Sequence, residues 1–357
     1  MAKCVIKDVA IRGIVCAVPG DPIPVEQLGA AFDPEEVQKT KSTVGLRQVY
    51  RVQPGQTAGD LCTEAASALL NDLGWDRNSI DGIILVTQTP DYVCPATACV
   101  IHGKLGLSVS AFAYDVNLGC SGYVYGLWMA SQAIASGTAK RVLLLAGDTS
   151  SRTLSPEDKS VAMLFGDAGT ATALEFDTSA PVMSYVMGSD GLGYDKLIVP
   201  AGGFRMRPSP EAFVRTRGED NAVRSPMELY MDGFAIFNFT LQRVGPLVRE
   251  TLALSNWEME CVDGFLFHQA NGFMLNTLAK KMKLPADRVP INIGKYGNTS
   301  MSSIPLLLAD DFSDRLRGGA PQKLLLAAFG IGYSWAAVAL TFSDVVTAKV
   351  INSKVRA

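Results

Sequence analysis

The sequence predicts an α/β fold built from two copies of one unit, with residues 1–176 as the first half and 177–357 as the second. Short apolar runs typical of buried strands recur at an interval of 182 residues, pairing 80–87 with 262–267 and 141–148 with 323–328. At that interval Cys120 corresponds to Ser302, and each lies in a small polar turn before a helical segment. The shared strands and turn indicate a duplication, in which the strand-end loops of both halves meet at one crevice.

The other segments fit this interpretation. Helical patterns are expected over 24–44, 60–73, 95–105 and 121–136, and strands over 80–87, 111–116 and 141–148. The run 141–148 is continuously apolar, as expected for a strand covered on both faces. Residues 324–342 are uncharged and approach membrane-spanning length, but glycines interrupt them. Two buried strands around a glycine turn explain this run better, so no membrane span is expected.

Composition sets the broad class of protein. Hydrophobic residues make up 48% and charged residues 19% of the 357 residues, which suffices for a substantial core. A net charge of −3 without a long basic run argues against nucleic acid as a partner. The seven cysteines include no CxxC pair, and the chain begins with no apolar signal segment. Reduced thiols in a cytoplasmic protein are therefore expected.

Cys120 is the candidate nucleophile. It lies at a predicted strand-to-helix turn, where unpaired N–H groups and the helix dipole would lower the pKa of its thiol. A lone cysteine is more often a small buried residue, so the interpretation depends on partners. His268 follows a predicted strand and Asn298 lies in a polar turn, and the duplicated scaffold can bring both to Cys120. Alone, they would be a structural histidine and a turn or helix-cap residue.

Six motifs, in order along the chain, resemble the β-ketoacyl-ACP synthase III family of the thiolase superfamily. They are NLGCSG at 117–122, FGDAG at 165–169, GSDG at 188–191, HQAN at 268–271, GNTS at 297–300 and AFGIGYSW at 328–335. The resemblance implies a homodimer with a duplicated, five-layered αβαβα thiolase-like fold and two pseudo-symmetric halves. It also implies a Cys120–His268–Asn298 triad that needs no metal or redox cofactor.

The same resemblance implies an acyltransferase of fatty acid biosynthesis. An acyl thioester of coenzyme A or of acyl carrier protein (ACP) would load Cys120, and the backbone N–H groups of Cys120 and Ile331 would form the oxyanion hole. His268 and Asn298 would then donate hydrogen bonds to the carbonyl of malonyl-ACP or malonyl-CoA. Loss of CO₂ would leave an enolate, stabilised in a dry site, that attacks the acyl-cysteine and gives a β-ketoacyl product.

The substrate-binding positions match the family only in part. Arg152 stands where the family has an arginine that grips the coenzyme A nucleotide. The Trp and Arg that clamp the nucleotide in the family are Lys39 and Thr43 here. Weak binding of coenzyme A, or a donor carried by ACP, is therefore expected.

The carrier-docking positions also differ from the family. Asn271, the last residue of the HQAN motif, is a candidate substrate contact. Beyond it, Phe273 replaces the family's docking arginine. Lys280 and Lys281 remain as candidates to meet an acidic carrier, although surface lysines are usually only solvated.

Two further features separate this chain from the family. Cys94 stands where a Phe typically reaches into the partner subunit's acyl pocket, which suggests a roomier pocket. Cys94, Cys99 and His102 are too loosely spaced for zinc, and His102 is expected to be structural. Segment 201–226 is longer than usual and carries arginines at 205, 207, 215, 217 and 224. It is either a solvated loop or a lid or acceptor-binding loop.

Two alternative functions stay open at this point. The altered tunnel and the arginine-rich segment would also suit an acyltransferase that moves the acyl group to an alcohol or amine in specialised metabolism. The other alternative is a non-catalytic subunit that completes a partner synthase, although such subunits commonly lose the nucleophile that Cys120 retains.

Overall fold

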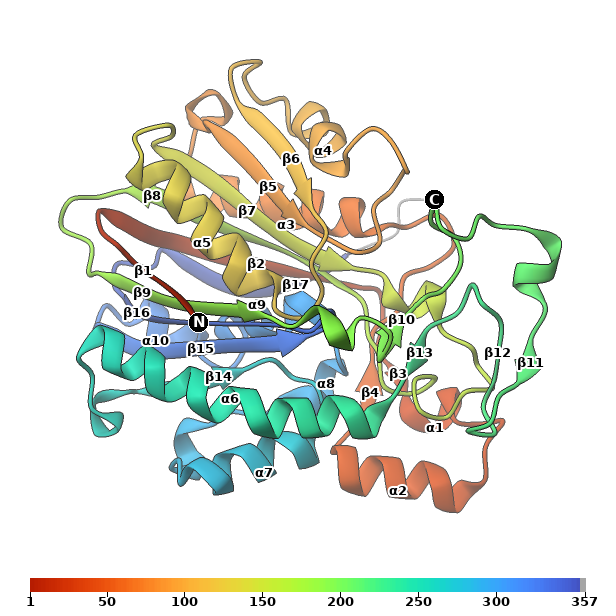
Figure 1. Ribbon diagram of the computed structural model, residues 1–357. Helices are drawn as coiled ribbons and strands as arrows, with labels where there is room; N and C mark the ends of the chain where they lie inside the picture. The colour runs from red at the N-terminus through yellow and green to blue at the C-terminus, as the bar shows by residue number, and fades with distance from the viewer. Residues whose placement is uncertain (354–357) are drawn as a thin grey trace.

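The computed structural model describes residues 1–353 as two stacked sheets with helices between them and on both outer faces (Figure 1). In spatial order the first sheet contains β17 (Thr347–Ser353), β2 (Val9–Pro19), β8 (Ala168–Phe176), β7 (Arg141–Asp148), β5 (Gly82–Val86) and β6 (Phe112–Val116). The second contains β1 (Ala2–Ile6), β9 (Met183–Ser189), β16 (Ser334–Phe342), β15 (Gln322–Gly330) and β14 (Gly264–Phe267).

The helices form the other three layers. The middle layer holds α5 (Gly122–Ala135), α9 (Ser303–Ala309) and α10 (Ser313–Arg317). The first sheet is covered outside by α3 (Ala58–Leu73) and α4 (Thr97–Leu105), and the second by α6 (Gly233–Ser255) and α7 (Gly272–Met282). The predicted five-layered αβαβα fold is therefore confirmed.

The two sheets repeat one topology. Strands β2, β8, β7 and β5 correspond in order to β9, β16, β15 and β14. In each set the first two pairings are antiparallel and the third is parallel. Within residues 1–353 the sheets differ at their margins: β6 has no counterpart in the second sheet, and β17 runs parallel to β2 whereas β1 runs antiparallel to β9.

The terminal strands cross between the halves. Strand β1, from the start of the chain, pairs with β9 in the second sheet. Strand β17, from the end of the described residues, pairs with β2 in the first sheet. The predicted boundary after residue 176 coincides with the end of β8. However, β1 belongs to the first half of the sequence and joins the second sheet, and β17 belongs to the second half and joins the first sheet.

Apolar packing between the layers holds the fold together. Leu127 of α5 and Leu307 of α9 are fully buried between the sheets. Outside the sheets, Leu69 of α3 and Leu275 of α7 pack in separate apolar clusters. The uncharged run 324–342 is the β15–β16 pair, buried on both faces as predicted. None of the helices described within residues 1–353 is long and apolar enough to cross a membrane.

The single helix expected over 24–44 is wrong. The chain instead forms β3 (Ile23–Pro24), α1 (Val25–Leu28) and α2 (Pro34–Val44). Asp33 caps α2 by accepting the N–H of Glu35 at 2.8 Å, and Pro34 occupies the first helical position. Proline is favoured at the start of a helix and disrupts its interior, so two helices replace one.

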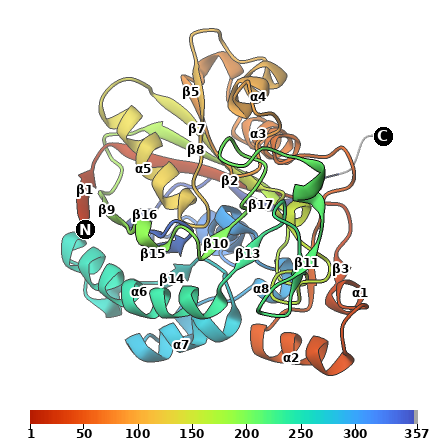
Figure 2. The same cartoon turned by 45° about the vertical axis from the view of Figure 1, so that its right-hand side comes forward.

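The short strands and helices that lie outside the two sheets gather at one end of them. Besides β4 (Gln48–Val49) and α8 (Ile293–Tyr296), they include β10 (Leu197–Ile198), β11 (Thr216–Arg217), β12 (Val223–Arg224) and β13 (Tyr230–Met231). Figures 1 and 2 show β10–β13 on the side toward which β7 and β15 point. The carboxyl ends of β7 and β15 therefore face the loops that carry the candidate site.

Candidate active site

Cys120 lies in the turn between β6 and α5 and meets the second half of the chain there. Only 6% of its surface is exposed. Its Sγ lies 3.9 Å from Oγ of Ser300, in the short helical turn Ser300–Ser302 that precedes α9. Loops of the two halves of the chain therefore meet at Cys120, as predicted.

Asn298 lies just before this turn, two residues ahead of Ser300. Its Oδ1 accepts the N–H of Ser300 at 2.9 Å, which leaves its amide N–H groups to donate. Its main chain is fixed on both sides, because its N–H donates to Leu164 and its carbonyl accepts the N–H of Gly166 at 3.1 Å. Leu164 and the adjoining FGDAG motif thus hold the backbone of Asn298 in place.

His268 follows β14, and its own N–H donates to the carbonyl of Ala327 at 2.9 Å. Its ring Nδ1 lies 2.8 Å from Oγ of Ser303, which also accepts the N–H of Gln269 at 3.2 Å. Burial lowers the pKa of His268 to about 3, while a contact with the Ser300 backbone raises it. The imidazole is therefore neutral near pH 7 and has one ring N–H to donate.

The loop after β15 closes the site over the sulfur. A Cβ at Gly330 would lie 2.7 Å from Cβ of Cys120, so only glycine allows this approach. The backbone N–H groups of Cys120 and Ile331 both act on the sulfur and lower the pKa of the thiol. Two hydroxyls tie loop and turn together: Ser121 bonds to Ser334 at 2.6 Å, and Ser334 donates to the carbonyl of Ile331 at 2.7 Å.

The expectation that the Cys120 thiol has a lowered pKa is wrong. Burial raises the pKa of Cys120 to about 12, and the charge of Asp148 raises it further. The hydrogen bond from Ser300 and the two N–H groups act in the opposite direction but are outweighed. The thiol is therefore protonated at rest, so attack by the sulfur requires a group that takes its proton.

Sequence reasoning missed two residues at this site. Ser300 contacts Cys120, Asn298 and His268, and lies in the left-handed region at φ +53°. Asp148 ends β7 with 2% of its surface exposed. Their only signals were membership of the GNTS motif and a carboxylate at the end of an apolar strand.

Arg152 lies in the short helical turn Ser150–Thr153. Its Nη2 donates to the carbonyl of Gln53 at 3.1 Å and to that of Gln56 at 2.7 Å. It forms no ion pair with a carboxylate within residues 1–353, so its charge is available to an anionic ligand.

The side-chain carbonyl of Asn271 caps the start of α7 and does not face an open site. Its Oδ1 accepts the N–H groups of Phe273 at 2.9 Å and of Met274 at 3.3 Å. Phe273 is 52% exposed and stacks on Phe237 with ring centroids 5.8 Å apart. Phe273 is therefore an exposed apolar residue packed against the partly buried Phe237.

Lys280 and Lys281 lie in the last turn of α7. At 1.5 Å per residue, they lie roughly 12 Å along the helix from its start near His268. Lys281 donates to the carbonyl of Leu241 at 3.2 Å, whereas the side chain of Lys280 is exposed. The structure therefore places both lysines away from the triad.

Within residues 1–353, Cys94, Cys99 and His102 do not form a cluster of candidate metal ligands. Cys94 and Cys99 are exposed, and Nε2 of His102 lies 2.9 Å from the carbonyl of Ser108, which is the structural role expected of it. Across residues 1–353 no group of three or more His, Cys, Asp or Glu side chains could hold a metal ion.

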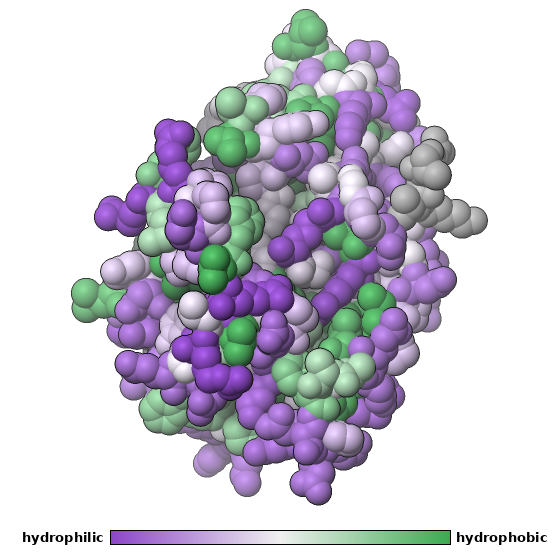
Figure 3. All heavy atoms as spheres, turned by 90° about the vertical axis from the view of Figure 1, so that its right-hand side faces the viewer, coloured by the Kyte–Doolittle hydropathy of each residue, from purple (hydrophilic) through white to green (hydrophobic). Residues whose placement is uncertain are grey.

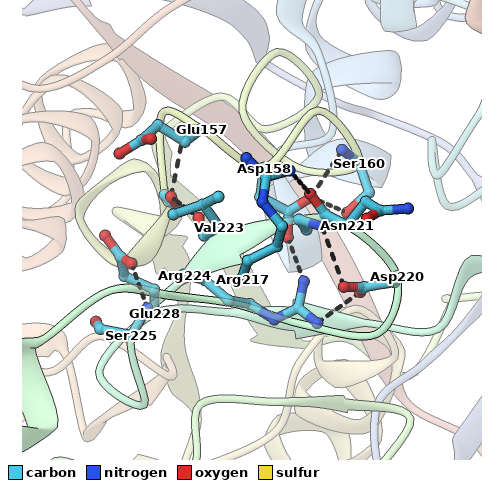
Figure 4. Close-up of polar contacts among 12 residues, drawn as sticks. Glu157, Asp158, Ser160, Arg217, Asp220, Asn221, Val223, Arg224, Ser225 and Glu228 are labelled. Carbon is cyan, nitrogen blue, oxygen red and sulfur yellow. Dashed lines mark hydrogen bonds and ion pairs between the residues drawn. The ribbon is translucent and has the colours of Figure 1, made fainter.

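Segment 201–226 is anchored by two of its arginines. Arg224 donates to the fully buried Asp158 at 2.9 Å and to Asp220 at 2.5 Å (Figure 4). Arg215 pairs with Glu228 at 2.6 Å. These pairs anchor the part of the segment around β11 and β12, whereas residues 202–208 are exposed to solvent.

The other arginines of this segment face solvent. Arg205, Arg207 and Arg217 are exposed, and the guanidinium of Arg207 lies 5.3 Å from the ring centroid of Phe204. Figure 3 shows that this side of the molecule is largely hydrophilic, with separate apolar patches.

The chain is similar along its length to known 3-oxoacyl-ACP synthases. Residues 114–191 match the family described as 3-oxoacyl-[acyl-carrier-protein (ACP)] synthase III, and 252–342 match its C-terminal domain. The chain is 37% identical to β-ketoacyl-[acyl-carrier-protein] synthase III 2 of Streptomyces coelicolor, covering 85% of this chain and 84% of that one. It is 35% identical to β-ketoacyl-[acyl-carrier-protein] synthase III of Nitratidesulfovibrio vulgaris, covering 93% and 99%. The crystal structure of a 3-oxoacyl-(acyl-carrier protein) synthase from Burkholderia xenovorans superposes with a TM-score of 0.93, 44% identity and 99% coverage of both chains.

Proposed function

The chain belongs to the 3-oxoacyl-[acyl-carrier-protein] synthase III family, and from that premise we propose that it is a condensing acyltransferase. It takes an acyl group onto Cys120 and joins it to the two-carbon unit of malonyl-ACP, giving a 3-oxoacyl-ACP as in fatty acid biosynthesis. One observation carries the proposal: Cys120, His268 and Asn298 all meet at the buried Ser300.

In the first half-reaction Cys120 is acylated. Its sulfur attacks the carbonyl of an acyl thioester, a new C–S bond forms, and the thiol of coenzyme A or of the carrier's pantetheine leaves. The negative oxygen of the intermediate accepts hydrogen bonds from the N–H groups of Cys120 and Ile331, which already act on the sulfur at rest. Such preoriented donors stabilise the transition state more than the ground state.

In the second half-reaction His268 and Asn298 donate hydrogen bonds to the carbonyl of the malonyl thioester. The bond to the carboxylate breaks, CO₂ leaves, and the electron pair forms an enolate held by these two donors. The enolate carbon then attacks the acyl carbonyl, the bond to the Cys120 sulfur breaks, and the released thiolate takes up one proton from solvent. A neutral imidazole suits this role, and the low pKa of His268 keeps it neutral. These steps use only groups of the protein, so we propose no metal or redox cofactor.

The functional unit we propose is a homodimer joined at β6. This strand is the margin of the first sheet, and an unpaired strand margin is a template for pairing with another chain. Tyr114 on β6 is 39% exposed, and the nearby Tyr92, Val93 and Val109 are 58%, 83% and 97% exposed. Such apolar exposure marks an interaction surface. The same contact would carry the Cys94 loop to the partner's acyl pocket.

Sedimentation velocity tests the dimer. The wild-type chain should sediment at twice its 38.1 kDa mass, and Tyr114→Lys, which places a charge in the contact, should shift it toward the monomer. A monomeric wild-type chain at micromolar concentration would contradict this proposal.

The proposed donors are acyl thioesters of coenzyme A or ACP, and the proposed compartment is the cytoplasm. The uncompensated charge of Arg152 favours an anionic donor. All seven cysteines lie within the described residues and are unpaired, which fits a reducing compartment.

Isotope-labelled malonyl-ACP and a panel of acyl-CoA and acyl-ACP donors test the reaction. Cys120→Ala should form no 3-oxoacyl product. His268→Ala and Asn298→Ala should still accept the acyl group but release CO₂ about 10² to 10³ times more slowly. His102→Ala, which alters the other histidine, should retain both steps. Product formation by Cys120→Ala would refute the proposal, and acyl transfer without Asn298-dependent CO₂ release would favour an alcohol or amine acceptor.

A further inference from the structure

Segment 201–226 is joined to the loop that follows β7. The hydroxyl of Ser155 in that loop donates to the carbonyl of Val223 at 2.6 Å. Beside this bond, the guanidinium of Arg224 donates to the carboxylate of Asp158 at 2.9 Å (Figure 4). No step of the proposed reaction uses this junction, although the loop that it holds continues into the FGDAG motif.

The ion pair at this junction is shielded from solvent. The side chain of Asp158 is fully buried, and that of Arg224 is 15% exposed. Two further contacts hold the guanidinium: an ion pair with Asp220 at 2.5 Å, and the ring of Tyr230, whose centroid lies 4.7 Å from the guanidinium carbon. Removing Arg224 would leave a buried carboxylate without its cation, which is strongly unfavourable unless the chain around it rearranges.

Asp158 also shapes the turn that follows it, residues 158–164. Its Oδ1 accepts the N–H of Ser160 at 2.9 Å and the hydroxyl of the same residue at 2.6 Å. Its main-chain carbonyl accepts the N–H of Ala162 at 2.8 Å. Its other carboxylate oxygen, Oδ2, meets Arg224. One side chain therefore serves both the ion pair and the turn, so the two are coupled.

The far end of this turn contacts Asn298 of the triad. The carbonyl of Leu164 accepts the N–H of Asn298 at 2.9 Å, and the N–H of Gly166 donates to the carbonyl of Asn298 at 3.1 Å. These bonds form a parallel bridge between the two segments. Turn 158–164 therefore links Arg224 at one end to the backbone of Asn298 at the other.

We propose that Arg224 is a positioning residue for the condensing step, acting on Asn298 through Asp158 and its turn. The inference rests on the proposed function, in which the Asn298 amide donates to the malonyl carbonyl. Such a donor is effective because it is fixed before the reaction, and a misplacement of about 1 Å can slow a step roughly 100-fold. The N–H groups that serve acylation lie outside this series of contacts, so acylation depends on it far less.

The test measures the two half-reactions separately, as acyl-adduct formation on Cys120 with acyl-CoA and as CO₂ release from labelled malonyl-ACP. Arg224→Gln should slow CO₂ release at least tenfold and acylation less than threefold. The matched control is Arg217→Ala, an arginine of the same segment that donates to the carbonyl of Asn221, and both rates should stay within threefold of wild type. Wild-type CO₂ release in Arg224→Gln, or an equal loss of both half-reactions, overturns the inference.

Asp158→Asn keeps the inference testable if Arg224→Gln does not fold, because it leaves no buried charge. Its amide has one acceptor oxygen for two sets of donors, Ser160 and Arg224, where the carboxylate has two. This variant should also slow CO₂ release at least tenfold, with acylation changed less than threefold. Release at the wild-type rate overturns the inference.

A double-variant comparison separates positioning from a general loosening of the fold. In a chain that carries Asn298→Ala, adding Arg224→Gln should slow CO₂ release by less than a further threefold, because the donor that Arg224 aligns is already absent. Losses that multiply overturn the inference, since Arg224 would then act independently of Asn298.

Hydrogen exchange gives a readout that does not depend on the reaction. The bonded N–H groups of Asn298 and Gly166 should exchange at least tenfold faster in Arg224→Gln than in the wild type, whereas those of β7 should be unchanged. Unchanged exchange at both positions overturns the inference. The two proposals fail differently: a wild-type chain that releases no CO₂ from malonyl-ACP refutes the function, whereas wild-type release with unaffected variants refutes only the positioning role.

Discussion

Gly330→Ala tests how closely the loop after β15 fixes the nucleophile. The new Cβ would lie 2.7 Å from Cβ and 3.0 Å from Sγ of Cys120. Carbon atoms pack at about 3.5–4.0 Å, so the two residues must separate by about 1 Å. A misplacement of about 1 Å can slow a reaction roughly 100-fold, which is about 2.7 kcal/mol in the activation barrier. Overpacking should also cost about 1–3 kcal/mol of folding stability.

The assay is the rate of acyl-adduct formation on Cys120, followed by intact-protein mass spectrometry and accompanied by a urea unfolding curve. The control is Gly103→Ala in α4, because a Cβ at Gly103 meets no atom within 4 Å. That variant should acylate normally and gain up to about 1 kcal/mol from helix propensity. If Gly330→Ala acylates within threefold of the wild type and keeps its stability, the close contact described here is refuted.

Three further predictions concern stability, each measured by urea unfolding. Arg224→Ala leaves the fully buried Asp158 without its cation and should cost about 2–4 kcal/mol of folding stability. The control Arg217→Ala loses one hydrogen bond to the carbonyl of Asn221 and should cost less than about 0.5 kcal/mol. Equal losses in the two variants would contradict the anchoring role of Arg224. Asn271→Ala removes the acceptor of two N–H groups at the start of α7 and should cost about 1 kcal/mol, and an unchanged midpoint would show that the cap is dispensable. The pKa of His268 is about 3 in the fold against an ordinary value of 6.5, so protonation favours the unfolded chain and stability is lost as pH falls below 6.5. Between pH 7 and pH 5 the wild type should lose about 2 kcal/mol more than His268→Asn, and equal losses would show that His268 is not buried as described.

The sequence pattern predicted the parts of the fold that depend on long apolar strands. The run 141–148 forms β7 within the predicted bounds, and its partner at the interval of 182 residues is β15. The exchange of β1 and β17 between the halves was not predictable, because each strand is short and pairs with a segment far away in the sequence. The break between α1 and α2 depended on how Asp33 and Pro34 restart a helix, which a periodic pattern hides.

The site was predictable where residue type alone determines chemistry. Cys120, His268 and Asn298 were identified from motifs, and the structure gathers them at Ser300. The protonation state of the thiol was not predictable, because it depends on burial by chain segments distant in sequence. Asp148 was hidden for the same reason: only the folded chain shows that the carboxylate at the end of β7 is buried.

One measurement tests the central claim most directly: the mass of the intact chain followed through both half-reactions. Incubation with a panel of acyl-CoA and acyl-ACP donors should add one acyl group, located on the peptide that contains Cys120. Addition of malonyl-ACP should then remove that group and yield one CO₂ and one 3-oxoacyl-ACP for each adduct lost. An adduct that persists with malonyl-ACP, or that leaves for water, an alcohol or an amine without CO₂ release, would contradict the assignment of a condensing enzyme.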